Sequence, residues 1–384
     1  MADWANWNAD SAPWTVGLEE EVMLLEPDGS PAWRSEDVLR ALPEALTEHT
    51  RGETHGLALE LATNPHTTVA AAANELRGMR AGLAETVRAL GLRAAVAGTH
   101  PTVRAEEVEV SPGVRYQYLH ASLRELARRE PTFALHVHVA VPDAELAVRA
   151  LNGMRAHIPV LLALSANSPF TRGTDSGLAS ARTPVFQAFP RTGIPRAMDS
   201  YADYVEAIDV LIRCGAIPEP TFIWWDVRLQ PKLGTIEVRI MDAQTRAADN
   251  AALAALVQSI VRLEALEGYA DEEIACRPEV LDENRFLATR DGMQAEFLDP
   301  ERAGRRPAAE ILEELLAALG PHAAALGSES ELAAVPALAA EPGYHRQRLL
   351  AGVAQGDEIG PGLGGLVSAL ATDFSAGLAT PAVA

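Results

Sequence analysis

The sequence predicts an α+β fold in which one polar sheet face carries the chemistry. Five short segments alternate apolar and polar residues with the period of two that is typical of strands. Longer alanine- and leucine-rich segments repeat apolar residues at spacings of three and four, which is typical of amphipathic helices. The polar residues of the strand segments are mainly carboxylates, histidines and arginines, so we expect a functional site rather than a solvated surface.

The strand segment around which the predicted site is organised spans residues 235–242. Ile236, Val238 and Ile240 face one side, whereas Glu237 and Arg239 face the other. On its own this alternation fits any half-solvated sheet. The prediction of a site depends on four further segments that repeat the same design.

The four further strand segments each place polar residues on one face. They span residues 16–25, 57–63, 133–141 and 222–229. If all five strands lie in one sheet, its polar face gathers Glu19, Glu21, Glu60, His136, His138, Asp226, Arg228, Glu237 and Arg239. Charged groups in such numbers need water, partners or a ligand.

Composition excludes several classes of protein. With 384 residues and 48% apolar residues, the chain can bury a sizeable core. A formal net charge of −21 argues against non-specific binding to nucleic acid or anionic membranes. Cys214 and Cys276 have no short spacing, the first residues lack a signal-peptide pattern, and no apolar run reaches the roughly 18 residues of a membrane span. We therefore expect a cytoplasmic protein.

The order of the segments predicts one large domain. We expect helices over residues 35–42, 67–90, 115–129, 143–164, 199–213, 245–266, 307–319 and 332–338, and a hairpin turn at residues 231–234. We expect a loose N-terminal arm over residues 1–13, a single domain over residues 14–355, and a Gly-rich, mobile tail over residues 356–384. The loop over residues 165–197 is dense in Gly, Pro, Ser and Thr, and its arginines favour phosphate contact.

The predicted ligand set favours Mg²⁺ or Mn²⁺, because several carboxylates and one histidine form an oxygen-dominated site. His136 and His138 form an H-x-H pair that also occurs in zinc hydrolases, but no third histidine or cysteine lies in a comparable strand. Arg239 would lie beside a metal-bound phosphate, with a plain salt bridge as the alternative. Walker A, G-x-G-x-x-G and G-x-S-x-G motifs are absent from the sequence.

Six motifs resemble the bacterial glutamate-cysteine ligase-like carboxylate-amine ligases. They are TVGLEEE at 15–21, LHVHV at 135–139, ALSANSPF at 163–170, ASAR at 179–182, WDVR at 225–228 and GTIEVR at 234–239. The resemblance implies a glutamine synthetase-like fold, in which a curved antiparallel sheet forms an active-site funnel backed by helices, with a helical C-terminal part. It also implies that Mg²⁺-ATP phosphorylates a carboxylate, usually the γ-carboxylate of glutamate, and that an amine attacks the acyl phosphate.

The same resemblance implies a role for each matching residue. Metal would be held by Glu19, Glu21, Glu60, His136 and Glu237; catalysis would use Arg239, Glu237 and Arg182; and the nucleotide would contact Arg228, Asn167, Ser168, Arg239 and His138. The expected partners are glutamate and an amine that the sequence does not name, within a homodimer as the commonest arrangement.

Two alternative functions remain open at this stage. One is a zinc hydrolase that uses the H-x-H pair and Glu60. The other is a nucleotide-binding relative without turnover, because Ala134 and Ala140 stand where the family usually has glycines.

Overall fold

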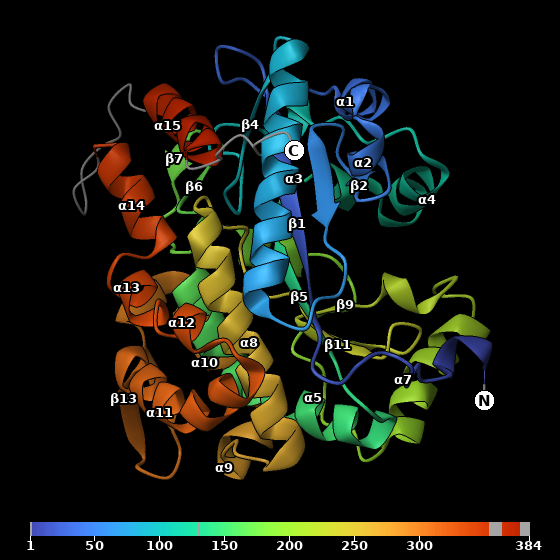
Figure 1. Ribbon diagram of the computed structural model, residues 1–384, viewed down its shortest axis with the longest axis vertical. Coiled ribbons are helices and arrows are strands. Elements are labelled where there is room, and N and C mark those ends of the chain that lie inside the picture. The colour runs from blue at the N-terminus through green and yellow to red at the C-terminus, as the bar shows by residue number, and fades with distance from the viewer. Residues whose placement is uncertain (1, 130, 353–362, 377–384) are drawn as a thin grey trace.

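The computed structural model describes residues 2–129, 131–352 and 363–376, and a seven-stranded sheet is its centre (Figure 1). The strands are β1 (Val16–Leu25), β2 (Thr50–Gly52), β3 (Ala58–Ala62), β4 (Arg93–Ala95), β5 (Leu135–Ala140), β10 (Val227–Gln230) and β11 (Thr235–Val238). Their order is β10-β11-β5-β1-β3-β2, with β4 also paired to β1, and every pair in this sheet is antiparallel. The predicted antiparallel sheet is confirmed.

The strand register brings the predicted polar residues together. Glu19 lies opposite His136, and Glu21 lies opposite Glu60. Glu237 lies between His138 on β5 and Arg228 on β10. Directly opposed residues share a face of the sheet, so the polar groups of five strands meet on one surface.

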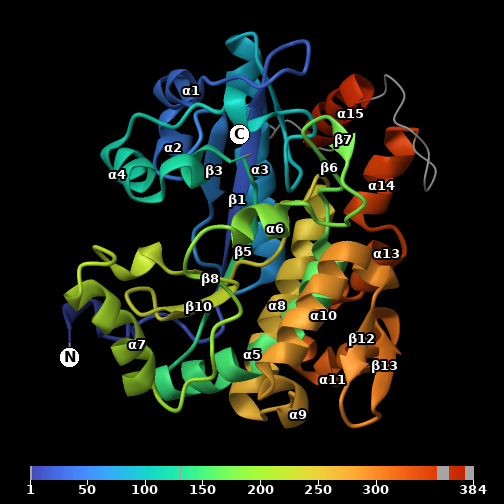
Figure 2. The same cartoon turned by 180° about the vertical axis from the view of Figure 1, so that it is seen from behind.

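Helices cover the apolar face of the sheet. Figure 1 shows α3 (Val69–Ala89) and α8 (Ala247–Leu266) in front of the strands, and α5 (Ala144–Ser165) packs on β10 and β11. The buried strand residues Leu18, Val137 and Ile236 belong to this core. On the other side, α6 (Arg182–Gln187) lies over the polar face (Figure 2).

The remaining elements surround these layers. They are α1 (Ser35–Ala41), α2 (Glu44–Thr47), α4 (Val114–Leu123), α7 (Tyr201–Arg213), α9 (Glu272–Ala275), α10 (Pro278–Asp291), α11 (Ala308–Leu326), α12 (Glu329–Leu332), α13 (Val335–Ala340), α14 (Gly343–Leu350), α15 (Leu363–Ser375), and the pairs β6 (Phe170–Thr171) with β7 (Thr174–Asp175), β8 (Thr192–Gly193) with β9 (Trp224–Trp225), and β12 (Glu296–Asp299) with β13 (Gly304–Pro307). No helix in the described part of the chain is both long and apolar enough to cross a bilayer.

Both ends of the described chain differ from the expected loose arm and tail. Near the N-terminus Ala5 is fully buried, and the Trp7 indole N–H donates to the Val141 carbonyl at 3.1 Å. Near the C-terminus α15 buries Leu366 and Phe374 and packs on β4 and α3. The tail expectation is therefore corrected over Leu363–Ser375, while residues 356–362 and 377–384 lie outside the described residues.

A buried ion pair ties the sheet to the helices on its apolar side. Glu20 lies between Glu19 and Glu21, so its side chain points to the opposite face. The Arg80 Nε on α3 donates to Glu20 at 2.6 Å, and the same guanidinium donates to the carbonyls of Gln244 and Thr245. The Asn250 amide on α8 donates to the same carboxylate at 2.6 Å. The middle glutamate of the run thus links β1, α3 and α8.

We expect Arg80→Met to lower the free energy of unfolding by about 3–5 kcal/mol, because it leaves the Glu20 carboxylate buried without its cation. Chemical denaturation measures this change. The control is Arg196→Met, which removes an exposed pair with Asp203 and should cost less than about 1 kcal/mol. Equal losses in the two variants would show that the buried pair has no special structural role.

Candidate active site

A cavity of about 560 Å³ lies over the polar face of the sheet. Most of the residues predicted to form the site line it: Glu19, Glu21, Glu60, His136, His138, Arg182, Arg228, Glu237 and Arg239. The remaining wall comes from the hairpin between β2 and β3, from α4, from α6 and from the segments that flank β9 and β10. The antiparallel sheet therefore forms the floor of a concave site, as predicted.

Carboxylates and histidines form three overlapping groups on this floor, which we call the carboxylate row. The groups are Glu19 with His138 and Glu237, Glu19 with Glu60 and His136, and Glu21 with Glu53 and Glu60. Within each group the possible ligand atoms lie within 4.8 Å of one another. Glu19 and Glu60 each belong to two groups, so the row runs continuously from β11 to the end of β2.

Glu53 is a member of the row that the sequence reasoning missed. It follows the three-residue strand β2, and its carboxylate accepts a hydrogen bond from the Thr54 N–H at 3.1 Å. No alternating pattern marks so short a strand. In the structure, the pairing of Gly52 with Leu59 brings Glu53 beside the Glu60 strand.

Burial, together with electrostatic repulsion, raises the pKa of the carboxylates at one end of the row. Burial, followed by the charge of Glu53, raises the pKa of Glu21 to about 8. Burial, followed by the charge of Glu19, raises the pKa of Glu60 well above its ordinary value. Burial also raises the pKa of Glu53. A bound divalent cation would relieve this repulsion.

Cationic neighbours have the opposite effect at the other end of the row. Burial alone would raise the pKa of Glu237, but Arg228 and Arg239 bring it well below its ordinary value. Burial would likewise raise the pKa of Glu19, yet His138 and His136 lower it. These two carboxylates are therefore ionised and ready to bind a cation.

The donor set of the row fits a hard divalent cation. The Glu60 carboxylate accepts no hydrogen bond from the described residues, and the buried Nε2 of His138 lies 3.4 Å from the Glu19 carboxylate without forming a hydrogen bond. Each of the three groups supplies carboxylate oxygens and at most one histidine nitrogen. This chemistry suits Mg²⁺ or Mn²⁺ better than Zn²⁺.

Arg228 and Arg239 both donate to Glu237, but they differ in how many of their donors are already used. Arg228 donates to both carboxylate oxygens of Glu237, at 2.7 and 3.1 Å, and also to the carbonyls of Thr221 and Ile223. Arg239 donates to Glu237 through one nitrogen, while its buried Nε has no partner within the described residues. Arg228 is thus committed to holding Glu237, whereas Arg239 keeps donors for a ligand.

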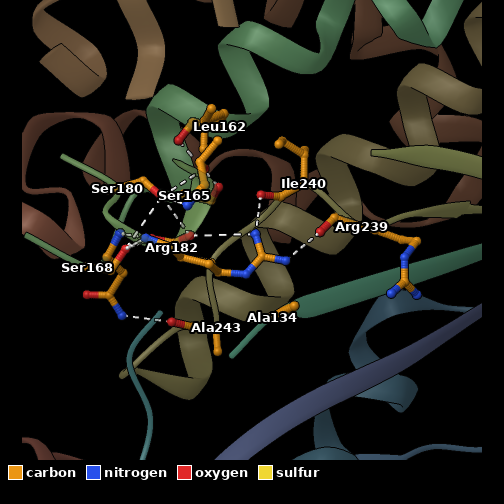
Figure 3. A network of polar contacts seen from close by, with 12 residues as sticks. Ala134, Leu162, Ser165, Ser168, Ser180, Arg182, Arg239, Ile240 and Ala243 are labelled. Atoms are coloured by element: carbon orange, nitrogen blue, oxygen red, sulfur yellow. Dashed lines mark hydrogen bonds and ion pairs between the residues drawn. The ribbon is translucent and has the colours of Figure 1, made fainter. Parts of the chain in front are cut away.

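Arg182 supports the backbone beneath Arg239. Its guanidinium donates to the carbonyl of Ile240 at 2.9 Å and to that of Arg239 at 3.0 Å (Figure 3). The Asp242 carboxylate lies 3.7 Å away. Figure 3 shows the Arg239 side chain pointing away from Arg182. Arg182 therefore fixes the end of β11, from which Arg239 reaches the cavity.

The structure does not bring Asn167 and Ser168 to the cavity. The Asn167 amide donates to the Ala243 carbonyl at 2.8 Å, and the Ser168 hydroxyl donates to Asp242 at 2.6 Å. Both side chains are completely buried. They fasten the loop to the segment after β11. Their contact with a nucleotide stays a prediction.

Three further polar residues also lie away from the cavity. Asp226 forms a buried ion pair with Arg285 on α10 at 2.6 Å. Arg191 donates to the Phe222 carbonyl, and Arg196 pairs with Asp203. Of the loop arginines predicted to contact phosphate, Arg182 is the one among the cavity-lining residues.

Comparisons with known proteins give one consistent family. The sequence profile of glutamate-cysteine ligase family 2 matches residues 15–364. Two Rubrobacter xylanophilus proteins, named as glutamate--cysteine ligases 2-1 and 2-3, are 39% and 40% identical over 326 and 341 residues. The first alignment covers 84% of this chain and 86% of the relative, and the second covers 88% and 92%.

Two solved structures share the fold. A Francisella tularensis glutamate--cysteine ligase in complex with AMP superimposes with a TM-score of 0.68 at 13% identity, covering 98% of this chain and 91% of that one. A bifunctional glutathione synthetase from Pasteurella multocida gives a TM-score of 0.70 at 15% identity, covering 95% and 52%. The predicted fold class and family resemblance are confirmed. The chain belongs to glutamate-cysteine ligase family 2 and is an ATP-dependent carbon–nitrogen ligase.

Proposed function

We propose that the chain uses Mg²⁺-ATP to activate the γ-carboxylate of glutamate as an acyl phosphate, which an amine then converts to an amide. The observation that carries this proposal is the carboxylate row with Arg239 beside it. Three overlapping acidic groups suit more than one divalent cation, and a guanidinium with unused donors suits the phosphate that is transferred.

The reaction needs positioning and charge neutralisation more than a protein nucleophile. An oxygen of the substrate carboxylate attacks the γ-phosphorus, and the bond to ADP breaks. The amine nitrogen then attacks the acyl carbon, phosphate leaves, and the nitrogen loses a proton. Bound divalent cations would neutralise phosphate charge, and the row residues Glu19, Glu21, Glu53, Glu60, His136, His138 and Glu237 are the ones that would hold them.

Each arginine near Glu237 has a separate proposed task. Arg239 donates to the transferred phosphoryl group, where charge develops in the transition state. Arg228 keeps Glu237 in one orientation through two hydrogen bonds. Arg182 acts through the backbone as a positioning residue.

The alanine at position 134 is compatible with turnover. The Ala134 backbone N–H donates to Glu21 at 2.7 Å. A backbone donor does not depend on the side chain, so alanine in place of glycine keeps this contact. The alanine at this position therefore gives no structural reason to expect a loss of turnover.

The direct test is ADP and phosphate release from Mg²⁺-ATP and glutamate, with and without a panel of amines that includes cysteine. We expect amine-dependent release together with an adduct of matching mass. Glu237→Gln should lower kcat about 100-fold or more, because it removes a carboxylate ligand of the divalent cation that would neutralise the phosphate charge. The matched control is Glu206→Gln on the exposed face of α7, which should leave kcat unchanged. No release with any amine, together with zinc in the purified protein, would support the hydrolase instead.

We also expect Glu60→Gln to raise Tm in the absence of metal and to reduce the gain in Tm that Mn²⁺ gives. Without metal the variant should have a higher Tm than the wild type, because the substitution removes a carboxylate that repels Glu21 and Glu53. With Mn²⁺ the wild type should gain more stability, since a cation that binds the folded state raises Tm.

Differential scanning calorimetry measures both effects, and electron paramagnetic resonance counts the bound Mn²⁺. The Glu206→Gln variant again serves as the control. Identical Mn²⁺-dependent gains in Tm for the wild type and Glu60→Gln would show that Glu60 holds no metal.

A further inference from the structure

Lys232 is the single lysine of the 384-residue sequence. The other residues in the combined count of lysine and arginine are all arginines. It lies in the turn between β10 and β11 and is exposed. Its side chain lines the cavity over the carboxylate row. The chain thus places its one flexible ammonium group at the candidate active site.

Most cations of the cavity wall already have partners. Arg182, Arg228 and Arg239 donate to carbonyls or to Glu237. Arg115 donates to the Glu219 carboxylate at 2.9 Å. These contacts reduce the positive charge that each arginine can offer to a ligand.

Lys232 and Arg51 differ from these arginines. Neither side chain makes a hydrogen bond or ion pair with the described residues. Arg51 lies on β2, at one edge of the sheet, whereas Lys232 follows β10 at the opposite edge. The cavity therefore offers one uncommitted cation at each end.

The backbone of the Lys232 turn is held in place by the N-terminal segment. The Asn8 N–H donates to the Pro231 carbonyl at 2.8 Å, and the Asn8 amide donates to the Lys232 carbonyl at 3.3 Å. Gly234 has a φ of 67°, and a Cβ there would lie 1.9 Å from the Asn8 carbonyl oxygen. The turn is therefore fixed while the lysine side chain stays available, an arrangement that reduces the entropy lost when a ligand binds.

The surroundings of Lys232 favour phosphate as its ligand. The preceding Gln230 amide donates to Glu237 at 2.7 Å, so the turn adjoins the group of Glu19, His138 and Glu237. An anion bound at this end would therefore lie beside a divalent cation. Lysine is a compact charge with three rotatable donors, so its ammonium can follow phosphate oxygens without a fixed geometry.

We propose that Lys232 binds the polyphosphate of the nucleotide. This inference rests on the proposed ligase function, because it takes the group of Glu19, His138 and Glu237 as the site of a nucleotide-bound cation. The Lys232 ammonium would neutralise phosphate charge from the turn that precedes β11, whereas Arg239 would do so from the residue that follows β11. The amino-acid substrate then occupies the part of the cavity nearer Arg51.

The test compares the KM values for ATP, glutamate and the amine in variants of Lys232. Lys232→Met should raise KM for ATP about tenfold, the worth of one charged hydrogen bond, while KM for glutamate and for the amine stays within about twofold of the wild type. Lys232→Arg should restore most of the loss, because arginine keeps the charge. A rise confined to KM for glutamate or the amine, or unchanged KM values throughout, would overturn the proposal.

A binding measurement separates this proposal from the ligase function itself. Calorimetry of Mg²⁺-ADP binding should show a Kd about tenfold weaker for Lys232→Met, and an unchanged Kd for Arg51→Met, which removes an equal charge at the opposite edge. If the wild type bound Mg²⁺-ADP without turnover, the ligase function would be contradicted. The Kd values of the two variants would still test the role of Lys232 in binding. Equal weakening in both variants, or no nucleotide binding by the wild type, would refute the role of Lys232.

Discussion

Repulsion among buried carboxylates is the constraint on which the rest of the site depends. Glu19, Glu21, Glu53, Glu60 and Glu237 share the wall of one cavity. At one end, burial and mutual repulsion raise the pKa of Glu21 and Glu60, while at the other end arginines and histidines keep Glu237 and Glu19 ionised. Such a cluster is neutralised by protonation, by cationic side chains or by bound cations. The acidic row and its arginines therefore form one unit.

The fold supplies the rigidity that this unit requires. Antiparallel pairing sets Glu19 against His136 and Glu21 against Glu60, and a slip of one residue would turn these side chains toward the helices. The Glu20–Arg80 pair opposes such a slip, because it holds the middle glutamate on the apolar side. Glu19 and Glu21 thus face the cavity, whereas Glu20 stabilises the opposite, apolar side of the same strand.

Much of this site follows from alternation within single strands. The period of two predicted which face Glu19, Glu60, His136 and Glu237 occupy, and the antiparallel sheet then brought them together. Contacts between distant segments could not be read in this way. Asp226 pairs with Arg285, which lies 59 residues further along, and that contact removes it from the cavity.

Short or irregular segments explain the other differences. Glu53 follows a strand of three residues, which is too short to show alternation. Asn167 and Ser168 lie in a loop with polar composition, yet both side chains are buried and donate to the segment after β11. Leu363–Ser375 begins among glycines, which hid the apolar face that α15 buries.

The most direct test of acyl phosphate formation follows an oxygen atom. Glutamate labelled with ¹⁸O in both γ-carboxylate oxygens should be turned over with Mg²⁺-ATP and the accepted amine, and the released phosphate analysed by mass spectrometry. The carboxylate oxygen that attacks phosphorus stays on phosphate when the amine displaces it, so we expect one ¹⁸O atom in each phosphate. Phosphate without ¹⁸O, released alongside amide product, would contradict activation through an acyl phosphate.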